Sequence, residues 1–466
     1  MKVLFASSEA APVARVGGLA EAAAGLIRAL RSDPRVDLTL VLPDYGDVEL
    51  ADETSRSLKV PSWVGTASVR SGVVPELGSL QLVSVPGMAR PNPYVDADGN
   101  GWPDNDRRFF GFSAGVAAIA NEGSFDLVHL NDWQTAIALA MTDLPSVFTI
   151  HTLGYQGRAN HNWLDFIGGD KIESFDRGDH FNPVAGAIDL ADAVVAVSPS
   201  YAEEIRESYR GEGLHNDLLA RGSELVGICN GIDTEMWDPT NDPYLIANFG
   251  RSTLAKKTVN SDHLRELAGW SGSDDLILGM VTRMVDQKGI DLAISLLPYL
   301  EHLRVRLFLL GSGEERLARW AREVSAENLE RFHYVEAYDV AIAHQIFGGA
   351  DFLLMPSRFE PCGLAQMQAM RYGTVPIVTP VGGLLDTVAD ADVYPDLGNG
   401  FMAKTIDVAG MVDAVHRAVA AGRVKRRYRE IQKRGMVVDW SWEEPKEQFL
   451  NLYRSVHEQA SKTKAT

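Results

Sequence analysis

Cysteine is scarce in this 466-residue chain, which contains only Cys229 and Cys362. Two cysteines so far apart do not form the disulfide framework of a small secreted domain, and they are not a Cys-x-x-Cys metal motif. Long apolar runs are lacking as well. The apolar start Val3–Ala6 is too short for a signal-peptide core, and no uninterrupted apolar segment approaches membrane-spanning length. These absences predict a protein of the reducing cytoplasm with no membrane partner.

Basic residues are also fewer than acidic residues. The chain has 44 Lys and Arg against 63 Asp and Glu, which gives a formal net charge of −19 at pH 7. An acidic field of this size repels polyanions, so we expect neither nucleic acid nor an anionic membrane surface as a partner. Small phosphate-bearing molecules can still bind where cations are collected in one site.

The length favours two domains, because single hydrophobic cores stop growing well below this size. In the first half, short apolar runs alternate with helical patterns, which is typical of a parallel sheet covered on both faces. We expect strands at Lys2–Ser7, Asp37–Pro43, Asp126–Leu130, Ser146–Ile150, Ala193–Ser198 and Glu224–Cys229, with helices over Gly17–Leu30, Arg108–Asn121, Asp132–Met141 and Ser200–Tyr209. Leu58–Arg90 has an alternating pattern with scattered glycines and predicts a small β insertion.

A second alternating series begins after Asp274. It predicts strands at Leu276–Arg283, Val305–Leu310, Phe332–Glu336, Asp351–Met355 and Val375–Thr379, with helices over Ile290–Leu300, Glu314–Val324, Ala341–Phe347 and Leu364–Tyr372. The fold class is therefore α/β, with two Rossmann-like, doubly wound parallel-sheet domains. We expect an N-terminal domain over 1–240, a C-terminal domain over 241–440 and a helical segment over 441–466. The Pro-, Asn- and Asp-rich stretch Asp238–Asn248 is the expected linker, and Lys462–Thr466 the expected frayed end.

Glycine-rich loops follow several of these strands. In such sheets ligands bind beyond the carboxyl ends of the strands, so loops after strands are the first place to look. Gly17 and Gly18 open a helix just after Arg15, and Gly382-Gly383 opens another. Glycines at a helix start let free amides approach anionic oxygens. A plain tight turn is the alternative for each loop taken alone.

Charged residues stand at the same kind of position. Arg283 ends a strand and Lys288 precedes a helix, which indicates a diphosphate clamp, with an ordinary solvated pair as the alternative. Glu360 lies in the loop Ser357–Leu364, where a carboxylate can hold sugar hydroxyls or simply cap a helix. His151 and Asp132 each follow a strand, with core packing and helix capping as their alternatives. Cys362 has no adjacent base and is interpreted as structural.

Together these segments resemble the bacterial glycogen synthases and plant starch synthases. The resemblance runs in collinear order through nearly the whole chain: Ser7–Glu9, Val16–Leu19, Asn92–Asp96, Trp102–Asn105, Ser198–Tyr201, Asn230–Asp233, Arg283 with Gln287–Gly289, Pro356–Leu364 and Gly382–Val388. It implies a GT-B fold whose C-terminal helix returns to the N-terminal domain. It also implies a retaining hexosyltransferase of carbohydrate biosynthesis. Such an enzyme moves a glucosyl unit from a nucleotide sugar to a carbohydrate acceptor, an α-1,4-glucan in typical members. Neither a metal nor another cofactor is implied.

The resemblance also implies roles for individual residues. Arg283 and Lys288 stabilise the leaving diphosphate, Glu360 holds the donor sugar, and His151 and Asp132 face the reacting sugar. The nucleotide sugar is bound by Arg15, Gly17, Gly18, Tyr338, Cys362, Gly363, Leu364, Gly382, Gly383 and Thr387. The residues expected on the acceptor or donor-sugar side are Glu9, Tyr94, Asn131, Gln134 and Asn230. Whether the chain forms a homo-oligomer stays open.

Several positions depart from the family pattern. The family usually has Lys, Asp, His, His, Asn and Lys where this chain has Arg15, Glu21, Asn131, Gln134, Thr152 and Ala185. All six lie in the N-terminal half, on the side implied for the acceptor and reacting sugar. We therefore keep as an alternative a natural-product glycosyltransferase, or a pseudo-glycosyltransferase with a cyclitol nucleotide donor and a small acceptor. A sugar-nucleotide epimerase and a catalytically inactive glucan-binding protein are further alternatives, and retention of the cations argues against the latter.

Overall fold

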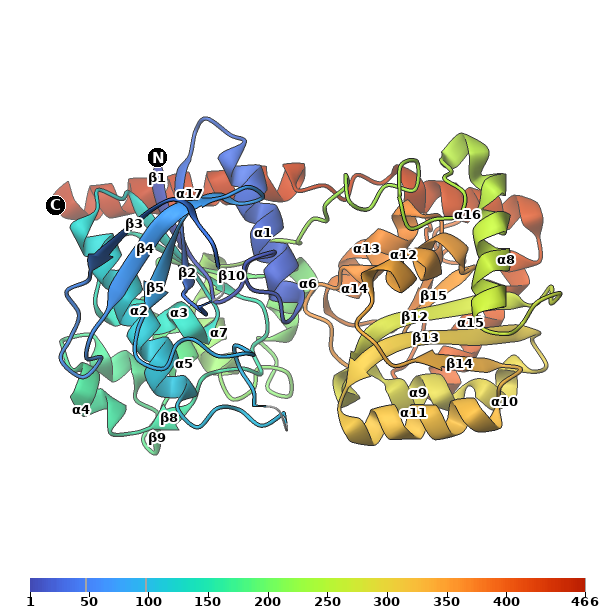
Figure 1. Ribbon diagram of the computed structural model, residues 1–466, viewed down its shortest axis with the longest axis horizontal. Coiled ribbons are helices and arrows are strands. Elements are labelled where there is room, and N and C mark those ends of the chain that lie inside the picture. Colours follow the sequence, from blue (N-terminus) through green and yellow to red (C-terminus); the bar gives the residue numbers. More distant parts are fainter. Residues whose placement is uncertain (47, 97–98, 466) are drawn as a thin grey trace. The chain divides into compact units, whose positions relative to one another are not determined.

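The computed structural model describes residues 1–46, 48–96 and 99–465, and it divides into two compact units (Figure 1). Unit 1 comprises Met1–Gly231 with Trp442–Thr466, and unit 2 comprises Ile232–Ser441. The chain thus enters unit 2 before the stretch Asp238–Asn248. That stretch is part of unit 2, because the buried Asp242 is bonded there by two side chains described below.

A sheet with the strand order β11-β10-β7-β6-β1-β2-β5-β4-β3 runs through unit 1. Its strands are β1 (Lys2–Ala6), β2 (Asp37–Pro43), β3 (Ala51–Ser57), β4 (Ser68–Val74), β5 (Gly78–Ser84), β6 (Leu127–Asn131), β7 (Ser146–Ile150), β10 (Ala193–Ala196) and β11 (Leu225–Gly227). Neighbours from β11 to β5 pair in parallel, whereas β4 pairs antiparallel with β5 and β3. The central strands are apolar and buried on both faces, as parallel strands between helices require.

The segment Leu58–Arg90 differs from the small insertion expected for it. Its strands β4 and β5 belong to the main sheet, since β5 pairs in parallel with β2 in the register Leu40↔Leu80. Leu80 and Leu82, two residues apart on β5, both point into the core, and this register keeps them buried. The edge strand β3 is exposed along its whole length and polar, so it lacked an apolar pattern from which to predict it.

Helices and short elements complete unit 1. They are α1 (Gly18–Arg31), α2 (Asn105–Glu122), α3 (Trp133–Ala136), η1 (Ile137–Ala140), β8 (Ala159–Asn160), α4 (Trp163–Ile167), η2 (Ile172–Phe175), β9 (His180–Phe181), α5 (Pro183–Leu190), α6 (Pro199–Glu204), α7 (His215–Ala220), η3 (Gly222–Glu224) and α17 (Glu443–Ala465). Two expected helices are shorter than predicted. Asp132–Met141 divides into α3 and η1, and Ser200–Tyr209 ends as α6 at Glu204.

The long C-terminal helix α17 packs on unit 1 (Figure 1). Trp442, just before the helix, and Phe449, Tyr453 and Val456 within it join the core formed by β1, β2 and α1. The Tyr453 hydroxyl lies 2.6 Å from Nδ1 of the buried His129 on β6. The helix continues through Ala465, and the end of the expected frayed segment, Thr466, lies outside the described residues.

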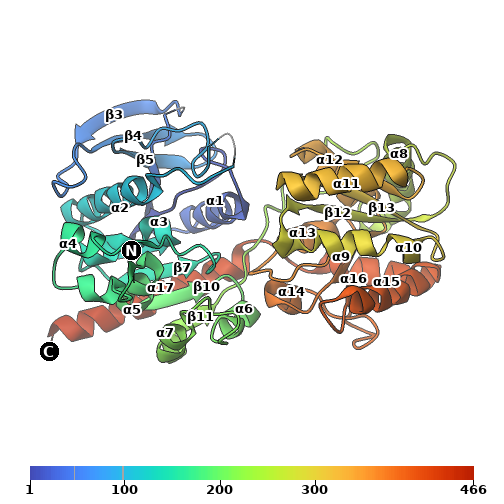
Figure 2. The same ribbon diagram turned by 90° about the horizontal axis from the view of Figure 1, so that it is seen from below.

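Unit 2 contains a parallel sheet in the order β14-β13-β12-β15-β16-β17. Its elements are η4 (Arg251–Lys256), α8 (Lys257–Leu267), β12 (Leu276–Met284), η5 (Asp286–Lys288), α9 (Ile290–Ser295), α10 (Leu297–Leu300), β13 (Val305–Gly313), α11 (Glu315–Glu327), β14 (Phe332–Val335), α12 (Val340–Gly349), β15 (Phe352–Met355), α13 (Ala365–Arg371), β16 (Val375–Val378), α14 (Gly382–Thr387), β17 (Phe401–Met402), α15 (Val408–Gly422) and α16 (Lys425–Val437). Helices α8 and α12 cover one face, and α9, α11 and α15 cover the other (Figures 1 and 2). Alternate residues of β13 serve the two cores, Leu307 and Leu309 on one side and Phe308 and Leu310 on the other.

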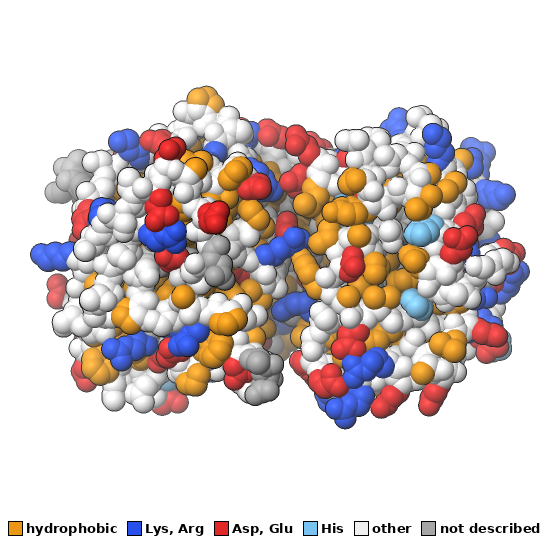
Figure 3. All heavy atoms as spheres, viewed as in Figure 1, with side chains coloured by type: hydrophobic (Ala, Val, Ile, Leu, Met, Phe, Trp, Pro, Cys, Tyr) orange, Lys and Arg blue, Asp and Glu red, His pale blue; other side chains and the backbone are white. Residues whose placement is uncertain are grey.

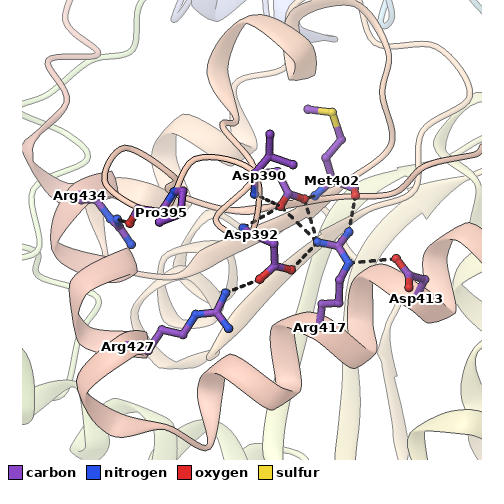
Figure 4. Close-up of polar contacts among 9 residues, drawn as sticks. Asp390, Asp392, Pro395, Met402, Asp413, Arg417, Arg427 and Arg434 are labelled. Carbon is purple, nitrogen blue, oxygen red and sulfur yellow. Dashed lines mark hydrogen bonds and ion pairs between the residues drawn. The ribbon is translucent and has the colours of Figure 1, made fainter.

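Two polar clusters, one buried and one partly exposed, hold loops of unit 2 in place. Asp242 accepts hydrogen bonds from the Tyr372 hydroxyl at 2.5 Å and from Nδ1 of His344 on α12 at 2.7 Å. The second cluster surrounds Arg417 on α15, which holds the loop between α14 and α15 (Figure 4). Arg417 contacts Asp390, Asp392 and Asp413, each at 2.9 Å, and donates to the carbonyl of Met402 at 2.6 Å. A guanidinium that binds both the loop and β17 restrains the chain that follows α14.

Candidate functional site

The first group of candidate residues surrounds the loop between β1 and α1 in unit 1. Glu9 is buried, with 3% of its surface exposed, and its Oε2 accepts hydrogen bonds from the main-chain N–H of Val16 at 2.7 Å and of Gly17 at 3.0 Å. Its Oε1 accepts from the Tyr94 hydroxyl at 2.6 Å. Glu9 therefore takes up two of the amides that the glycine pattern offered to an anion, and it shapes the loop itself.

Open space surrounds the two glycines of this loop. A Cβ atom added to Gly17 or Gly18 would meet nothing within 4 Å. The protein interior therefore does not explain the absence of side chains there, which is consistent with close approach of a ligand. Arg15 forms a 2.7 Å ion pair with Glu21 in the first turn of α1.

Asn131, Asp132 and His151 come together at the carboxyl ends of β6 and β7. The main-chain N–H of His151 donates to Oδ1 of Asp132 at 2.8 Å, and Nε2 of the ring lies 2.9 Å from Oδ1 of Asn131. Asp132 has φ 54° and ψ −178°, a backbone conformation that residues other than glycine rarely adopt. Such strain at the end of a strand is a common feature of functional sites.

Burial shifts the pKa values of Asp132 and His151. It raises the pKa of the Asp132 carboxyl to about 7, although hydrogen bonds from the main chain of His151 and Thr152 lower it. Burial also lowers the pKa of the His151 imidazole to about 3, so the ring is neutral near pH 7. The cluster thus combines a neutral imidazole with a carboxyl that titrates close to neutrality.

Gln134 and Asn230 are less closely tied to this group. Gln134 on α3 is 6% exposed, and its buried Oε1 has no hydrogen-bond partner among the described residues. Asn230 is half-buried near the end of unit 1. Neither side chain makes a hydrogen bond to Glu9, His151 or Asp132 within the described part of the chain.

The second group lies at the carboxyl ends of β12 and β15 in unit 2. Nζ of Lys288 forms a 2.6 Å ion pair with Oε2 of Glu360, which also accepts a hydrogen bond from the Ser357 hydroxyl at 3.0 Å. The side chains of Lys288 and Glu360 are 17% and 7% exposed. Arg283 is exposed at the end of β12, and its guanidinium pairs with no acidic side chain in the described residues.

The loops that carry Lys288 and Glu360 are bonded to each other. Nε2 of Gln287 donates to the carbonyl of Phe359 at 2.8 Å, and the N–H of Arg358 donates to the carbonyl of Gln287 at 2.8 Å. Arg358 also pairs with Asp291 on α9 at 2.6 Å. These contacts fix the positions of Lys288 and Glu360 relative to each other. From the sequence alone, no role was assigned to Ser357, Gln287 or Arg358, although all three lie inside motifs that carry the resemblance.

The start of α14 packs against the Glu360 loop. The N–H of Gly383 donates to the carbonyl of Glu360 at 3.1 Å, and a Cβ atom at position 383 would lie 2.2 Å from the carbonyl oxygen of Cys362. Gly383 is therefore required by close backbone approach, and Gly382 precedes it at φ 41°. Cys362 is buried, with 4% of its surface exposed.

The remaining nucleotide-side candidates differ in accessibility. Thr387, 3% exposed, donates from its hydroxyl to the carbonyl of Gly383 at 2.7 Å, so it supports α14 from within. Leu364 is the N-cap residue of α13, directly after Gly363. Tyr338 is 72% exposed in the loop after β14, where a ring can stack on a flat ligand.

Acidic and basic side chains are interspersed on the face shown in Figure 3. Among the described residues, no group of three or more His, Cys, Asp or Glu side chains is placed to hold a metal ion, and no helix is long and apolar enough to span a membrane.

Comparisons with known proteins match both units of the chain. A family model described as the starch synthase catalytic domain matches residues 2–220, and one described as glycosyl transferases group 1 matches residues 270–435. The glycogen synthase of Halorhodospira halophila is 39% identical over 98% of this chain and 99% of its own length. Glycogen synthase of Gloeobacter violaceus is 38% identical over 98% of this chain and 99% of its own.

Solved structures give the same result. The catalytic domain of starch synthase IV from Arabidopsis thaliana, bound to ADP and acarbose, superposes with a TM-score of 0.88 at 30% identity, covering 98% of this chain and 99% of that one. Sucrose-phosphate synthase from Thermosynechococcus elongatus has a TM-score of 0.64 at 18% identity and shares the fold. The relatives cover both units from end to end. The chain therefore belongs to the glycogen synthase and starch synthase family of GT-B glycosyltransferases.

Proposed function

We propose that this enzyme transfers a glucosyl unit from ADP-glucose to the end of an α-1,4-glucan with retention of configuration, and that it acts in the cytoplasm. The observation that carries the proposal is the ion pair of Lys288 with the buried Glu360, together with the exposed Arg283, at the carboxyl ends of the adjacent strands β12 and β15. Relatives named glycogen synthase and the ADP- and acarbose-bound starch synthase support the donor and the acceptor. The two cysteines are both free, which suits a reducing compartment.

Arg283 and Lys288 are assigned to the leaving diphosphate. As the glycosidic bond to phosphate breaks, negative charge grows on the diphosphate oxygens, and fixed cations stabilise that state more than the bound substrate. Arg283 has its guanidinium available, and Lys288 is held in place by Glu360. Arg283 and Lys288 thus supply the positive charge that a metal ion provides in other transferases, and the proposed reaction needs no metal ion.

Glu360 is assigned to the hydroxyls of the donor sugar. Its carboxylate has oxygen lone pairs beyond those used by Lys288 and Ser357, so it can accept from sugar hydroxyls. The loops of Gly363, Leu364, Gly382 and Gly383 lie next to it and are assigned to phosphate and sugar, with Tyr338 under the base.

The unit 1 residues are assigned to the reacting sugar and the acceptor. The neutral His151 faces the sugar, and so does Asp132. The acceptor or donor-sugar side is assigned to Glu9, Tyr94, Asn131, Gln134 and Asn230. Arg15, Gly17 and Gly18 approach the phosphates. Retention follows from attack on the face that the diphosphate leaves, with the leaving phosphate accepting the proton of the acceptor hydroxyl.

Release of nucleoside diphosphate tests the proposal. The purified chain is incubated with ADP-, UDP-, GDP- and dTDP-glucose, with and without glycogen or maltose. Acceptor-dependent release of ADP, with growth of the glucan, is the expected result. Tight binding of a nucleotide without turnover on any glucose donor would contradict it and favour an unusual sugar or cyclitol donor. Conversion of the nucleotide sugar without an acceptor would identify an epimerase.

A further inference from the structure

The side-chain amide of Asn131 lies between two partners whose chemistry fixes its orientation. Nδ2 is 2.9 Å from the main-chain carbonyl oxygen of Ala6, and Oδ1 is 2.9 Å from Nε2 of His151. A main-chain carbonyl only accepts hydrogen bonds, so the amide must turn its NH2 group toward Ala6. Its oxygen then necessarily faces the imidazole.

This orientation determines which ring nitrogen of His151 carries the proton. The oxygen of an amide only accepts, so Nε2 must be the protonated nitrogen that donates to it. In a neutral imidazole the other nitrogen, Nδ1, then has a lone pair and no hydrogen. Burial lowers the pKa of the ring to about 3, so this neutral form prevails near pH 7. No described residue forms a hydrogen bond with Nδ1.

We infer that Asn131 is a positioning residue that holds His151 as the neutral Nε2–H tautomer, so that Nδ1 accepts a hydrogen bond from a hydroxyl of the bound sugar. The tautomer follows from contacts within unit 1, whereas the sugar contact rests on the proposed function.

The surroundings keep the pair rigid. Asn131 and Thr149 are register partners on the adjacent parallel strands β6 and β7, and His151 follows two residues after Thr149. Asn131 is 1% exposed, so water does not compete for its amide. The main-chain N–H of His151 is bonded to Asp132, which fixes the backbone that carries the ring.

The same arrangement makes the site selective for hydrogen-bond donors. A lone pair at Nδ1 attracts a hydroxyl, which has a proton to give, and repels a carbonyl or ether oxygen, which has none. The imidazole usual at position 131 in the family can donate or accept, and so permits either tautomer of the partner ring. An amide fixed by Ala6 permits only one.

Nitrogen-15 spectroscopy of the histidine rings tests the inference without requiring activity. The full chain is labelled in its 11 histidines, and the His151 signals are assigned by their loss in His151→Gln. At pH 7 the wild type should show a protonated Nε2 and an unprotonated Nδ1. A protonated Nδ1, or a doubly protonated ring, would overturn the assignment.

Variants then identify the residue responsible. Asn131→Ala removes the acceptor and should convert the His151 signals into those of a tautomer mixture. Gln134→Ala truncates a nearby buried amide that is not bonded to His151, and should leave the tautomer unchanged. A pure Nε2–H ring in Asn131→Ala would show that Asn131 does not set it. We expect kcat/KM of Asn131→Ala to fall by about tenfold, as for loss of one buried hydrogen bond.

Titration with ADP and with ADP-glucose separates this inference from the proposed function. The Nδ1 signal should move with ADP-glucose and stay in place with ADP alone. Binding of ADP-glucose with no movement of Nδ1 would overturn the hydroxyl contact. Absence of ADP-glucose binding in calorimetry would refute the proposed function and the sugar contact together, while the spectra of the free protein still decide the role of Asn131.

Discussion

The ion pair between Lys288 and Glu360 supports a prediction that separates structure from catalysis. Lys288→Met and Glu360→Gln are made singly and together, because each removes a charge and keeps most of the side-chain volume. Glu360 is 5% exposed, and among the described residues its carboxylate receives hydrogen bonds only from Lys288 at 2.6 Å and Ser357 at 3.0 Å. Removing the lysine therefore leaves a buried carboxylate with one neutral donor.

The magnitudes follow from this burial. Breaking a buried ion pair costs about 3–5 kcal/mol, and the 17% exposure of Lys288 places its loss nearer about 2–3 kcal/mol. Glu360→Gln leaves a more accessible ammonium and an amide that still bonds Ser357, so about 1–2 kcal/mol is expected. The double variant leaves no unpaired charge and should lose about 1 kcal/mol. Denaturant unfolding of the four proteins measures these values.

Turnover should behave differently from stability. If Lys288 stabilises the leaving diphosphate, Lys288→Met loses about 10²–10³-fold in kcat, and the added Glu360→Gln does not restore it. The assay is ADP release from ADP-glucose with glycogen, at a temperature well below unfolding of all four proteins. If kcat recovers in the double variant together with stability, the pair is only structural and its catalytic role is refuted.

Three further predictions concern single residues. Arg283→Ala should reduce kcat about 10²–10³-fold with unfolding free energy changed by less than about 0.5 kcal/mol, whereas the exposed control Arg319→Ala on α11 should affect neither; equal activities would remove Arg283 from the mechanism. Gly383→Ala places a Cβ atom 2.2 Å from the Cys362 carbonyl and should destabilise unit 2 by about 1–3 kcal/mol in thermal unfolding, so an unchanged Tm would contradict the close approach. The pKa of Asp132 is raised to about 7 by burial, so the folded state keeps a proton that the unfolded state releases above about pH 4. Stability contributed by this group is present below about pH 4 and is lost as the pH rises toward 7, by about 4 kcal/mol at most. Asp132→Asn should flatten that part of the stability profile, measured by denaturant unfolding at several pH values. An unchanged slope would show that Asp132 is ionised throughout.

Much of the fold could be predicted from local pattern. The strands Asp37–Pro43 and Ser146–Ile150 have the bounds expected for them, because short apolar runs between turns have few other structures available. The polar strand β3 could not be predicted, since it lacks an apolar pattern and is held by pairing with β4 and by ion pairs such as that between Arg56 and Glu122. Helix α9 ends at Ser295, before α10, although the apolar pattern continued through Ile290–Leu300.

The candidate site was predictable in part. Strand ends followed by Gly, Arg, Lys or His indicated where Arg283, Lys288 and His151 lie, because carboxyl ends of parallel strands share one edge of a sheet. The same reasoning offered the amides at Gly17 to a phosphate, yet Glu9 takes the N–H of Gly17. A carboxylate eight residues away in the chain leaves no local pattern that would reveal this bond.

By itself, the sequence determined the alternation of strands and helices, the acidic charge balance and the positions of the loops after strands, because each depends on neighbouring residues alone. Only the tertiary structure decided which side chains meet. Lys288 and Glu360 are 72 residues apart, and Asn131 and His151 are 20 apart, yet parallel pairing of their strands brings each pair within hydrogen-bonding distance. Burial in the folded protein also raises the pKa of Asp132 and keeps His151 neutral. This desolvation depends on the packed surroundings and not on residue type.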